Sequence, residues 1–361
     1  MKQNWKYKCI KDICKKGSSN IVINKIKDNE GEFSLFGASG LVKKIDFFQS
    51  GSPYIGIVKD GSGVGKVNSY PAKSSLVGTM QYIFPNEGTD LSFLKYALQG
   101  LNLSSFASGA AIPHIYFKDY GKCKIPVPEI EEQRLIAEEL DLIQSIIDKQ
   151  KHQLLELDNL QQSIFHNMFG DLLDNKKSNK TLKEVAEYFI GLTYKPSDVS
   201  NSGTIVLRSS NIQGNQLDFK DIVRVSINVS EKKKVKEGDI LMCARNGSAK
   251  LVGKVARIKK MSEEMSFGAF MTIIRSRYND FLFHFFKSAF FRSQLNSSKT
   301  ATINQITSKM LDKIQVPIPP LALQKEFAEK IEAIECQKEL IKKSIADSEQ
   351  LFNYTMDKYF G

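Results

Sequence analysis

Residues 126–170 read PVPEIEEQRLIAEELDLIQSIIDKQKHQLLELDNLQQSIFHNMFG, and this stretch decides the fold because the chain repeats it. Residues 317–361 read PIPPLALQKEFAEKIEAIECQKELIKKSIADSEQLFNYTMDKYFG, the same pattern displaced by 191 positions without a gap. Identical residues recur at this offset, among them Gln133 and Gln324. An internal repeat of this length indicates a repeated structural unit. We therefore interpret the rest of the sequence around these two copies.

Both copies are predicted to be long helices. Their seam positions recur at alternating steps of four and three over about five heptads, a pattern typical of coiled coils. Neither copy has a proline after its first turn, and the prolines that open each copy fix an extended approach to the helix. About forty helical residues span ~60 Å, and such a helix with half of its seam exposed needs a partner. The predicted seam consists of Ile136, Leu140, Ile143, Ile147, Leu154, Leu157, Ile164, Phe327, Ile331, Ile334, Ile341, Ile345 and Phe352.

The other copy is the nearest candidate for that partner. The alternative is two unrelated amphipathic helices, each packed on its own domain, but the shared phase and endpoints favour a pair. We expect an α+β protein in which two mixed α/β globular domains alternate with the two helices. The predicted parts are a first globular domain (1–124), a first helix (125–170), a polar linker (171–180), a second globular domain (181–313) and a second helix (314–361).

The net charge of +11 is unevenly distributed. Residues 129–169 hold nine acidic and three basic residues, and residues 320–360 hold eight acidic and six basic residues. The two helices therefore carry −6 and −2, which leaves +19 for the rest of the chain. A basic surplus confined to the globular parts is typical of phosphate binding, although generic solubility charge is the alternative.

The cysteines and histidines indicate neither a disulfide framework nor a zinc site. The five cysteines are scattered and odd in number, and none of the four histidines lies near a second type of ligand. The first residues show no secretory signal, and the most apolar run, residues 281–291, is too short to span a bilayer. We expect a cytoplasmic protein with no membrane association, and we expect residues 281–291 to form a buried helix.

We find no catalytic, cofactor-binding or metal-ligating pattern. Residues 61–66 look like a phosphate-binding loop, but the Walker pattern requires a glycine where Asp60 stands and a serine or threonine where Val67 stands. The sequence contains no dinucleotide-binding fingerprint, no nucleophile–base arrangement and no motif by which amino-methyltransferases grip a flipped base. The chain is therefore predicted not to be an enzyme.

Residues 54–67 and residues 240–255 are both predicted to be hairpins with small residues and cations at their turns. Small residues allow a turn to approach DNA closely, and Arg208–Asn211 follows a predicted strand with side chains that can read base edges. The alternative is a set of ordinary exposed turns with solvated lysines. The candidate DNA contacts are Lys59, Ser62, Lys66, Arg208, Ser209, Asn211, Arg245, Asn246, Ser248 and Lys254.

Four stretches carry a resemblance to a known family. They are IPVPEIEEQRLIAEEL (125–140), VPIPPLALQKEFAEKI (316–331), GDILMCARNGSAKLVGKV (238–255) and LKEVAEYFIGLTYKPSD (182–198). Together they resemble the specificity (S) subunit of type I restriction–modification systems, over essentially the whole chain. The first copy departs from the proline-rich form, because residues 129–131 are Glu-Ile-Glu where residues 320–322 are Pro-Leu-Ala.

The resemblance implies a non-catalytic subunit for host defence and DNA methylation. In that family two target recognition domains are separated by two helices, which pack antiparallel about a pseudo-two-fold axis. Each domain would read one half of a bipartite site on double-stranded DNA, while the helices set the gap. The expected partners are two methyltransferase (M) subunits, with restriction (R) subunits left open. S-adenosylmethionine, ATP and magnesium are expected on those partners and not on this chain.

Two other function classes stay open at this point. One is a coiled-coil adapter that does not bind DNA, against which the +19 of the globular parts argues. The other is an enzyme that modifies DNA on its own, against which the absent motifs argue.

Overall fold

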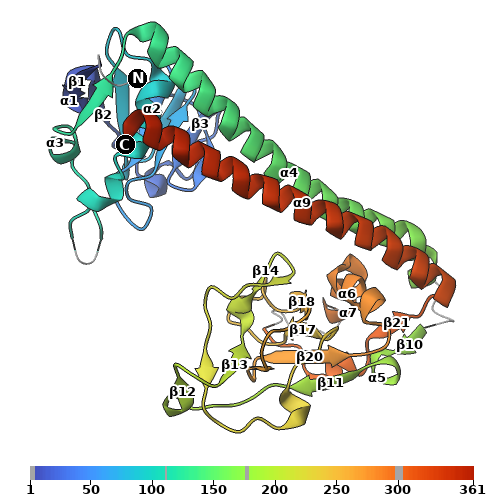
Figure 1. Ribbon diagram of the computed structural model, residues 1–361. Helices are drawn as coiled ribbons and strands as arrows, with labels where there is room; N and C mark the ends of the chain where they lie inside the picture. The colour runs from blue at the N-terminus through green and yellow to red at the C-terminus, as the bar shows by residue number, and fades with distance from the viewer. Residues whose placement is uncertain (1–4, 110–111, 175–178, 297–303) are drawn as a thin grey trace. The chain divides into compact units, whose positions relative to one another are not determined.

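The structure is a computed structural model in which the chain divides into two compact units. The first unit combines Met1–Gln153 with Ile341–Gly361, and the second unit is Leu154–Leu340. The two long helices, α4 (Ile130–Asp174) and α9 (Leu321–Phe360), each contribute one half to each unit (Figure 1). The residues described are 5–109, 112–174, 179–296 and 304–361.

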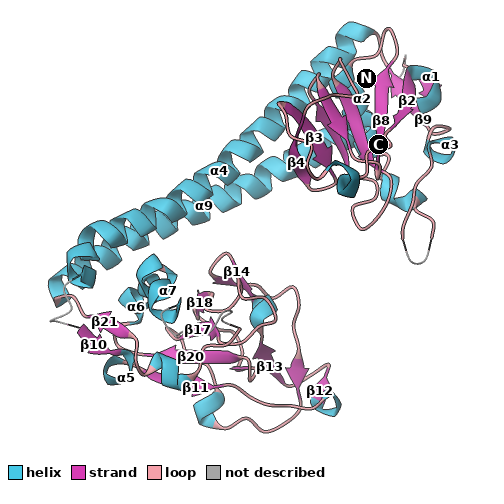
Figure 2. Cartoon of the chain, turned by 180° about the vertical axis from the view of Figure 1, so that it is seen from behind, coloured by secondary structure: helices cyan, strands magenta, loops and turns pink. Residues whose placement is uncertain are grey.

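Within each unit the halves of α4 and α9 pack side by side in opposite directions (Figure 2). In the first unit the Tyr359 hydroxyl donates to a carboxylate oxygen of Glu139 at 2.6 Å. In the second unit the Lys338 ammonium donates to Asp158 at 2.8 Å. Residue numbers rise along α4 as they fall along α9, so the pairing is antiparallel in both units.

The burial of the helix residues follows the predicted seam along most of its length. The buried seam residues are Ile136, Leu140, Ile143, Ile147, Phe327, Ile331, Ile334 and Ile345. The partly buried seam residues are Leu154, Leu157, Ile164, Ile341 and Phe352.

Near the end of α4 the buried face moves by one position: Phe165 and Phe169 are buried, whereas the predicted seam places Ile164 there. A straight helix drifts by ~20° per heptad, or ~80° over the four heptads from Ile136. That angle is close to the ~100° that separates neighbouring helix residues.

A glutamine fixes the start of both long helices. The Gln133 side-chain amide donates to the Pro128 carbonyl at 2.9 Å, and that of Gln324 donates to the Pro319 carbonyl at 2.7 Å. These two bonds are related by the offset of 191. They satisfy the carbonyls just before Glu129 and Pro320, whose own carbonyls accept the first backbone bonds of the two helices.

The first long helix ends later than predicted. It continues through Gly170 to Asp174, into the segment predicted as a linker. Leu172 packs against the core of the second unit, and this contact extends the helix. Of the predicted linker, residues 175–178 lie outside the described residues. Its last residues form β10 (Asn179–Thr181), which pairs antiparallel with β21 (Gln315–Pro317).

The first globular domain is built on a four-stranded sheet with the order β2-β8-β5-β6, beside a three-stranded sheet with the order β4-β3-β7 and the pair β1-β9. The strands are β1 (Lys6–Cys9), β2 (Cys14–Ser18), β3 (Phe33–Gly37), β4 (Gly40–Ile45), β5 (Tyr54–Val58), β6 (Val67–Tyr70), β7 (Ser74–Leu76), β8 (Met80–Pro85) and β9 (Lys124–Val127). The helices are α1 (Ile10–Ile13), α2 (Leu91–Gly100) and α3 (Phe117–Tyr120), with 3-10 turns η2 (Ile23–Ile26) and η3 (Leu103–Phe106).

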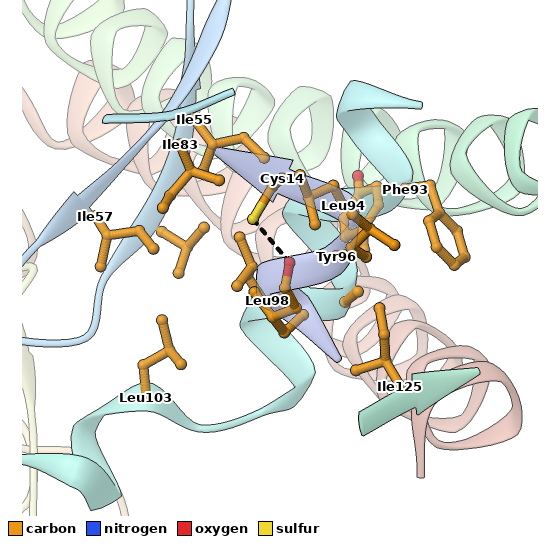
Figure 3. Close-up of a cluster of buried hydrophobic side chains, with 14 of the residues drawn as sticks. Cys14, Ile55, Ile57, Ile83, Phe93, Leu94, Tyr96, Leu98, Leu103 and Ile125 are labelled. Carbon is orange, nitrogen blue, oxygen red and sulfur yellow. Dashed lines mark hydrogen bonds between the residues drawn. The ribbon is translucent and has the colours of Figure 1, made fainter. Parts of the chain in front are cut away.

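Helix α2 anchors this domain to the long helices of its own unit. Asp90 caps it by accepting a hydrogen bond from the Phe93 amide at 2.9 Å. Phe93 then contacts Phe360 of α9, with ring centroids 5.3 Å apart. Figure 3 shows the core cluster around α2, in which the buried Cys14 thiol donates to the Ile10 carbonyl at 3.1 Å.

The second globular domain has the sheets β11-β20-β17-β18 and β12-β16-β13-β19 and the pair β14-β15. Its strands are β11 (Glu187–Ile190), β12 (Val199–Ser200), β13 (Thr204–Leu207), β14 (Ile212–Gln213), β15 (Gln216–Leu217), β16 (Arg224–Val225), β17 (Ile240–Cys243), β18 (Val255–Arg257), β19 (Met265–Phe267) and β20 (Met271–Arg275). Its helices are α5 (Leu182–Val185), α6 (Asn279–Lys287), α7 (Ala289–Asn296) and α8 (Ser308–Leu311), with 3-10 turns η5 (Pro196–Asp198), η6 (Ser209–Asn211) and η7 (Glu231–Lys233).

The apolar run predicted as one buried helix forms two helices, α6 and α7. The break falls at Ser288, whose backbone is extended and whose hydroxyl donates to the Phe285 carbonyl at 2.6 Å. Phe281 of α6 packs against Phe165 of α4, with ring centroids 5.5 Å apart. This aromatic contact joins the second globular domain to the long helices of the second unit.

In the described part of the chain, no helix is long and apolar enough to cross a membrane. The same residues contain no group of three or more histidines, cysteines or carboxylates arranged to hold a metal ion. Each of the five cysteines is a free thiol, and burial raises the pKa of the Cys14 thiol to about 12.

Candidate nucleic-acid interface

The predicted hairpin of the first domain is formed by β5 and β6, which pair antiparallel. In its loop the Gly65 amide donates to the Val58 carbonyl at 2.9 Å, and both Gly61 and Gly65 have positive φ. A side chain at Gly65 would also meet the backbone of Ser104. The loop therefore needs these glycines for its path.

The three candidate residues of this loop are placed differently. Ser62 and Lys66 are exposed, so both can reach a ligand. Lys59 is half-buried, with its ammonium 4.0 Å from the neighbouring Asp60 carboxylate. At this tip the structure thus presents the exposed Lys66 ammonium and the exposed Ser62 hydroxyl.

A second loop, not identified from the sequence, clamps this tip. The Gly61 amide donates to the Pro113 carbonyl at 3.0 Å, and the Ile115 amide donates to the Lys59 carbonyl at 3.0 Å. Between these bonds, the His114 ring contacts the Asp60 carboxylate. The hairpin tip is therefore held by residues 113–115, which lie near the end of the first domain's sequence.

The second domain repeats this clamp with other side chains. Its hairpin, β17 and β18, is antiparallel, and the loop after β17 receives the same kind of support. The Asn246 amide donates to the Asn304 carbonyl at 3.2 Å, and the Ile306 amide donates to the Ala244 carbonyl at 2.7 Å. Ile306 and Ile115 are related by the offset of 191. The two tips therefore share a backbone frame while their side chains differ.

Four of the predicted contacts converge at the second tip. Asn246 donates from its side-chain amide to the Ser209 hydroxyl at 3.1 Å, which joins the loop after β17 to the loop after β13. Arg208 extends from the same loop and pairs with Asp221 at 2.7 Å. Arg245 is exposed beside them. This cluster offers two guanidinium groups, one hydroxyl and one amide on adjacent loops.

The remaining predicted contacts of this domain are arranged otherwise. Asn211 is buried, and its side chain donates to the Asp218 and Asp221 carbonyls at 2.9 and 2.8 Å. Lys254 donates its ammonium to the Ile212 carbonyl at 2.7 Å. Asn211 and Lys254 therefore hold the loops in place, because their side chains bond backbone carbonyls of those loops. Ser248 is exposed and free to reach outward.

A cavity of about 870 Å³ in the second unit is a different kind of site. It lies between α6, α9 and the loop around Met261, and its lining includes five cationic and five acidic residues. His284 lines it with a buried Nδ1 that has no hydrogen-bond partner among the residues that the structure describes. Burial lowers the pKa of His284 to about 3, so this ring is neutral. The balanced charge of the cavity does not suit a polyanion such as DNA.

The model of one family matches most of this chain. It is the type I restriction modification DNA specificity domain, and it matches residues 2–158 and again residues 175–350. The chain belongs to the type I DNA specificity family. The two matches each contain one globular domain with part of a long helix, and both clamped tips fall inside them.

Relatives from three organisms show how far this specificity family extends along the chain. The specificity subunit of the EcoKI type I enzyme of Escherichia coli is 37% identical over 156 residues, which cover 41% of this chain and 33% of that protein. The StySPI specificity subunit of Salmonella potsdam is 36% identical over 156 residues, which cover 41% of this chain and 34% of that protein. The MjaVIII specificity subunit of Methanocaldococcus jannaschii is 25% identical over 301 residues, 76% of this chain and 71% of that protein. The matched part thus spans about a third of the first two relatives.

Solved structures of the family share the fold. The S subunit from M. genitalium superposes with a TM-score of 0.57 at 17% identity, covering 99% of this chain and 96% of that one. A second chain, from a study of complex assembly in a type I system, superposes with a TM-score of 0.53 at 16% identity and is covered to 98%. These likenesses support the α+β fold of mixed helices and strands.

Proposed function

We propose that this specificity subunit recognises a bipartite site on double-stranded DNA, with one half read by each globular domain. The observation that carries the proposal is the pair of clamped tips, in which one backbone frame presents two different sets of side chains. A repeated frame with divergent side chains suits two readers of different sequences. Lys66 and Ser62 would act in the first domain, and Arg208, Arg245 and Asn246 in the second.

The charge distribution supports binding of DNA by the globular parts of the chain. They carry +19, whereas the long helices carry −6 and −2. Phosphate contacts position a protein on DNA without reading its sequence, and base contacts in the grooves specify the site. Asn211 is left out of the proposed base contacts because its side chain is buried and bonds two backbone carbonyls.

The long helices are proposed to act as a ruler. They would form one antiparallel coiled coil that relates the two repeats by a pseudo-two-fold axis and keeps the two readers at a set separation. The acidic charge of the helices supports this role, since it would repel the DNA backbone. The unread gap between the two half-sequences would then depend on the helix length.

The outer faces of the helices are proposed to dock two methyltransferase subunits. Their exposed leucines and isoleucine support this, because Leu135, Leu142 and Ile146 lie on one face of α4 and neighbouring exposed apolar side chains suit a protein partner. S-adenosylmethionine, ATP and magnesium would be held by partner subunits, and this chain would perform no chemistry itself. A restriction subunit and a cytoplasmic setting belong to the same proposal. The exposed residues are Leu135, Leu142, Ile146, Leu155 and Leu340.

An exchange of domains tests this function. Residues 182–313 would be replaced by the corresponding segment of a relative with a known target, and modified bases would be mapped across the genome of cells that express the chimera with its partners. One half of the modified sequence is expected to change, and the other half and the gap are expected to stay. Change in both halves would contradict one-domain, one-half reading. A chain without salt-dependent DNA binding in the assembled complex would instead be an adapter.

A further inference from the structure

Phe270 stands at the tip of the second domain as an exposed aromatic residue. Its side chain is 57% exposed, although single large apolar residues on a surface need no explanation by themselves. Here the phenyl ring lies beside the Arg245 guanidinium, whose central carbon is 5.3 Å from the ring centroid. An aromatic face next to a cation is the combination that proteins use to stack on nucleic acid bases.

The turn that carries Phe270 is fixed from one side by β13. Residues 268–271 form a tight turn between β19 and β20, closed by a hydrogen bond from the Met271 amide to the Gly268 carbonyl at 2.8 Å. The Gly268 amide donates to the Leu207 carbonyl at 2.9 Å. Leu207 is the last residue of β13 and directly precedes Arg208. The turn and the loop of Arg208 are therefore held together.

From the other side the turn is held by the loop after β17. The Phe270 carbonyl accepts the amides of Ala244 and Arg245 at 2.9 and 3.0 Å. These bonds place Phe270, Arg245 and Asn246 on one surface, next to Ser209. An aromatic ring on so constrained a turn loses little freedom when it stacks on a ligand.

The first domain provides an internal comparison. Residues 77–80 form the equivalent turn, closed by the Met80 amide and the Val77 carbonyl at 2.9 Å. The Thr79 carbonyl accepts the amides of Lys59 and Asp60 at 3.0 and 3.3 Å. Thr79 and Phe270 are separated by 191 positions, so they occupy the same place in the two repeats. The aromatic ring is thus a feature of the second domain alone at this position.

We propose that Phe270, backed by Arg245, is a base-stacking site that inserts against one base step in the DNA half-site of the second domain. The proposal rests on the proposed function and adds a residue that reads the deformability of the DNA. Apolar side chains placed between base steps unstack them, and the energetic cost depends on the sequence of the step. Phe270 would then favour a flexible pyrimidine–purine step in that half-site.

The test uses the full chain assembled with its partner subunits, on a duplex that carries the target identified from genomic methylation. Phe270→Ala is expected to weaken binding to this duplex by about 5- to 100-fold, the usual effect of losing one stacked base. Binding to random-sequence DNA and its salt dependence are expected to stay. Phe270→Trp is expected to restore target binding, because it keeps an aromatic face. The matched control is Phe219→Ala, which removes another exposed phenylalanine (44% exposed) of the same domain.

The fluorescence of a base analogue provides a second measurement. It would not depend on Phe270 if this residue were needed only for the structure of the domain. With 2-aminopurine at successive positions of the second half-site, fluorescence is expected to rise at one step with the wild-type chain and not with Phe270→Ala. Unchanged target binding by Phe270→Ala, or weakened assembly with the partner subunits in place of weakened DNA binding, would overturn the stacking site. A wild-type complex with no preference for any sequence would refute the proposed function as well.

Discussion

The ammonium nitrogen of Lys338 on α9 lies 2.8 Å from a carboxylate oxygen of Asp158 on α4. Lys338 stands four positions after the seam residue Ile334 and three before Ile341, where the heptad pattern predicts an apolar residue. Lys338 also bonds Glu335 at 3.0 Å, and Glu335 accepts from Gln161 at 2.7 Å. Burial alone would lower the pKa of Lys338, but these hydrogen bonds outweigh it and leave the pKa above its ordinary value. A polar group at one seam position fixes the register of two helices.

Truncation of this lysine is predicted to destabilise the second unit. Lys338→Ala removes the partner of two carboxylates, and since both are partly exposed we expect a loss of about 2–3 kcal/mol, below the ~3–5 kcal/mol of a fully buried pair. Urea denaturation of the full chain measures the loss. Lys343→Ala, which removes an exposed lysine of the same helix, is the control and is expected to change stability by less than about 0.5 kcal/mol. Equal effects of the two substitutions would show that the buried ammonium does not contribute.

His284 is predicted to make the stability of the second unit fall in mild acid. Its pKa is about 3 in the fold against 6.5 when unfolded, so the neutral ring stabilises the fold above pH 6.5 and this contribution is lost as the pH falls. Between pH 6.5 and pH 4 the loss amounts to about 3 kcal/mol. His284→Phe is expected to flatten the profile of stability against pH over this interval.

The control for that prediction is His166→Phe on α4, which replaces an exposed histidine. Its profile is expected to match that of the wild type. An unchanged slope in His284→Phe would show that the ring is hydrated and charged in the folded chain.

Gly191 is predicted to be essential for the turn of Phe270. A Cβ at Gly191 would collide with the carbonyl oxygens of Phe267 and Gly268, which are backbone atoms that cannot move aside alone. Gly191→Ala is therefore expected to cost about 2 kcal/mol or more and to weaken target binding. Gly247→Ala is the matched control, because a Cβ there meets nothing within 4 Å. Thermal denaturation and DNA binding of both variants measure the contrast, and equal stability would refute the close packing.

The length of the helices is predicted to set the gap in the target. An insertion of seven residues in α4 after Gln150, matched by seven in α9 at Ser344, keeps the seam in phase at the place where their side chains bond at 2.7 Å. The added ~10 Å equals about three base pairs. Methylation mapping is expected to show a gap longer by about three base pairs between unchanged half-sequences. A longer gap with altered half-sequences, or an unaltered gap, would contradict the ruler.

Much of this architecture follows from the sequence because it is periodic or repeated. The prolines at 126–128 and 317–319 and the glutamines that follow them mark the start of both helices, and the Asp-Gly and Asn-Gly turns mark both hairpins. Periodicity does not show which face of a helix is buried by parts of the chain that are distant in sequence. Phe165 and Phe169 become the buried face of α4 because Phe281 packs on them, a contact more than a hundred positions away.

The candidate interface was harder to predict for the same reason. The His114 ring contacts the Asp60 carboxylate although the two residues lie far apart in the sequence, and no local sequence pattern indicates that contact. Asn211 looked available for a base edge, yet burial commits its amide to two backbone carbonyls. Phe270 has no sequence signal of its own, because a single apolar residue forms no periodic pattern. Comparison of Thr79 with Phe270 across the offset of 191 was the available signal.

The division of each unit between distant parts of the chain has a consequence for synthesis on the ribosome. The core around Phe93 includes Tyr359, and Phe352 and Phe360 pack against it, so the first globular domain cannot complete its core until those residues emerge. At roughly 5–20 residues per second, residues 1–153 wait about 10–40 s for residues 341–361. The second unit, whose residues 154–340 are contiguous, is fully synthesised by the end of that interval. The nascent chain therefore finishes its later half before its earlier half.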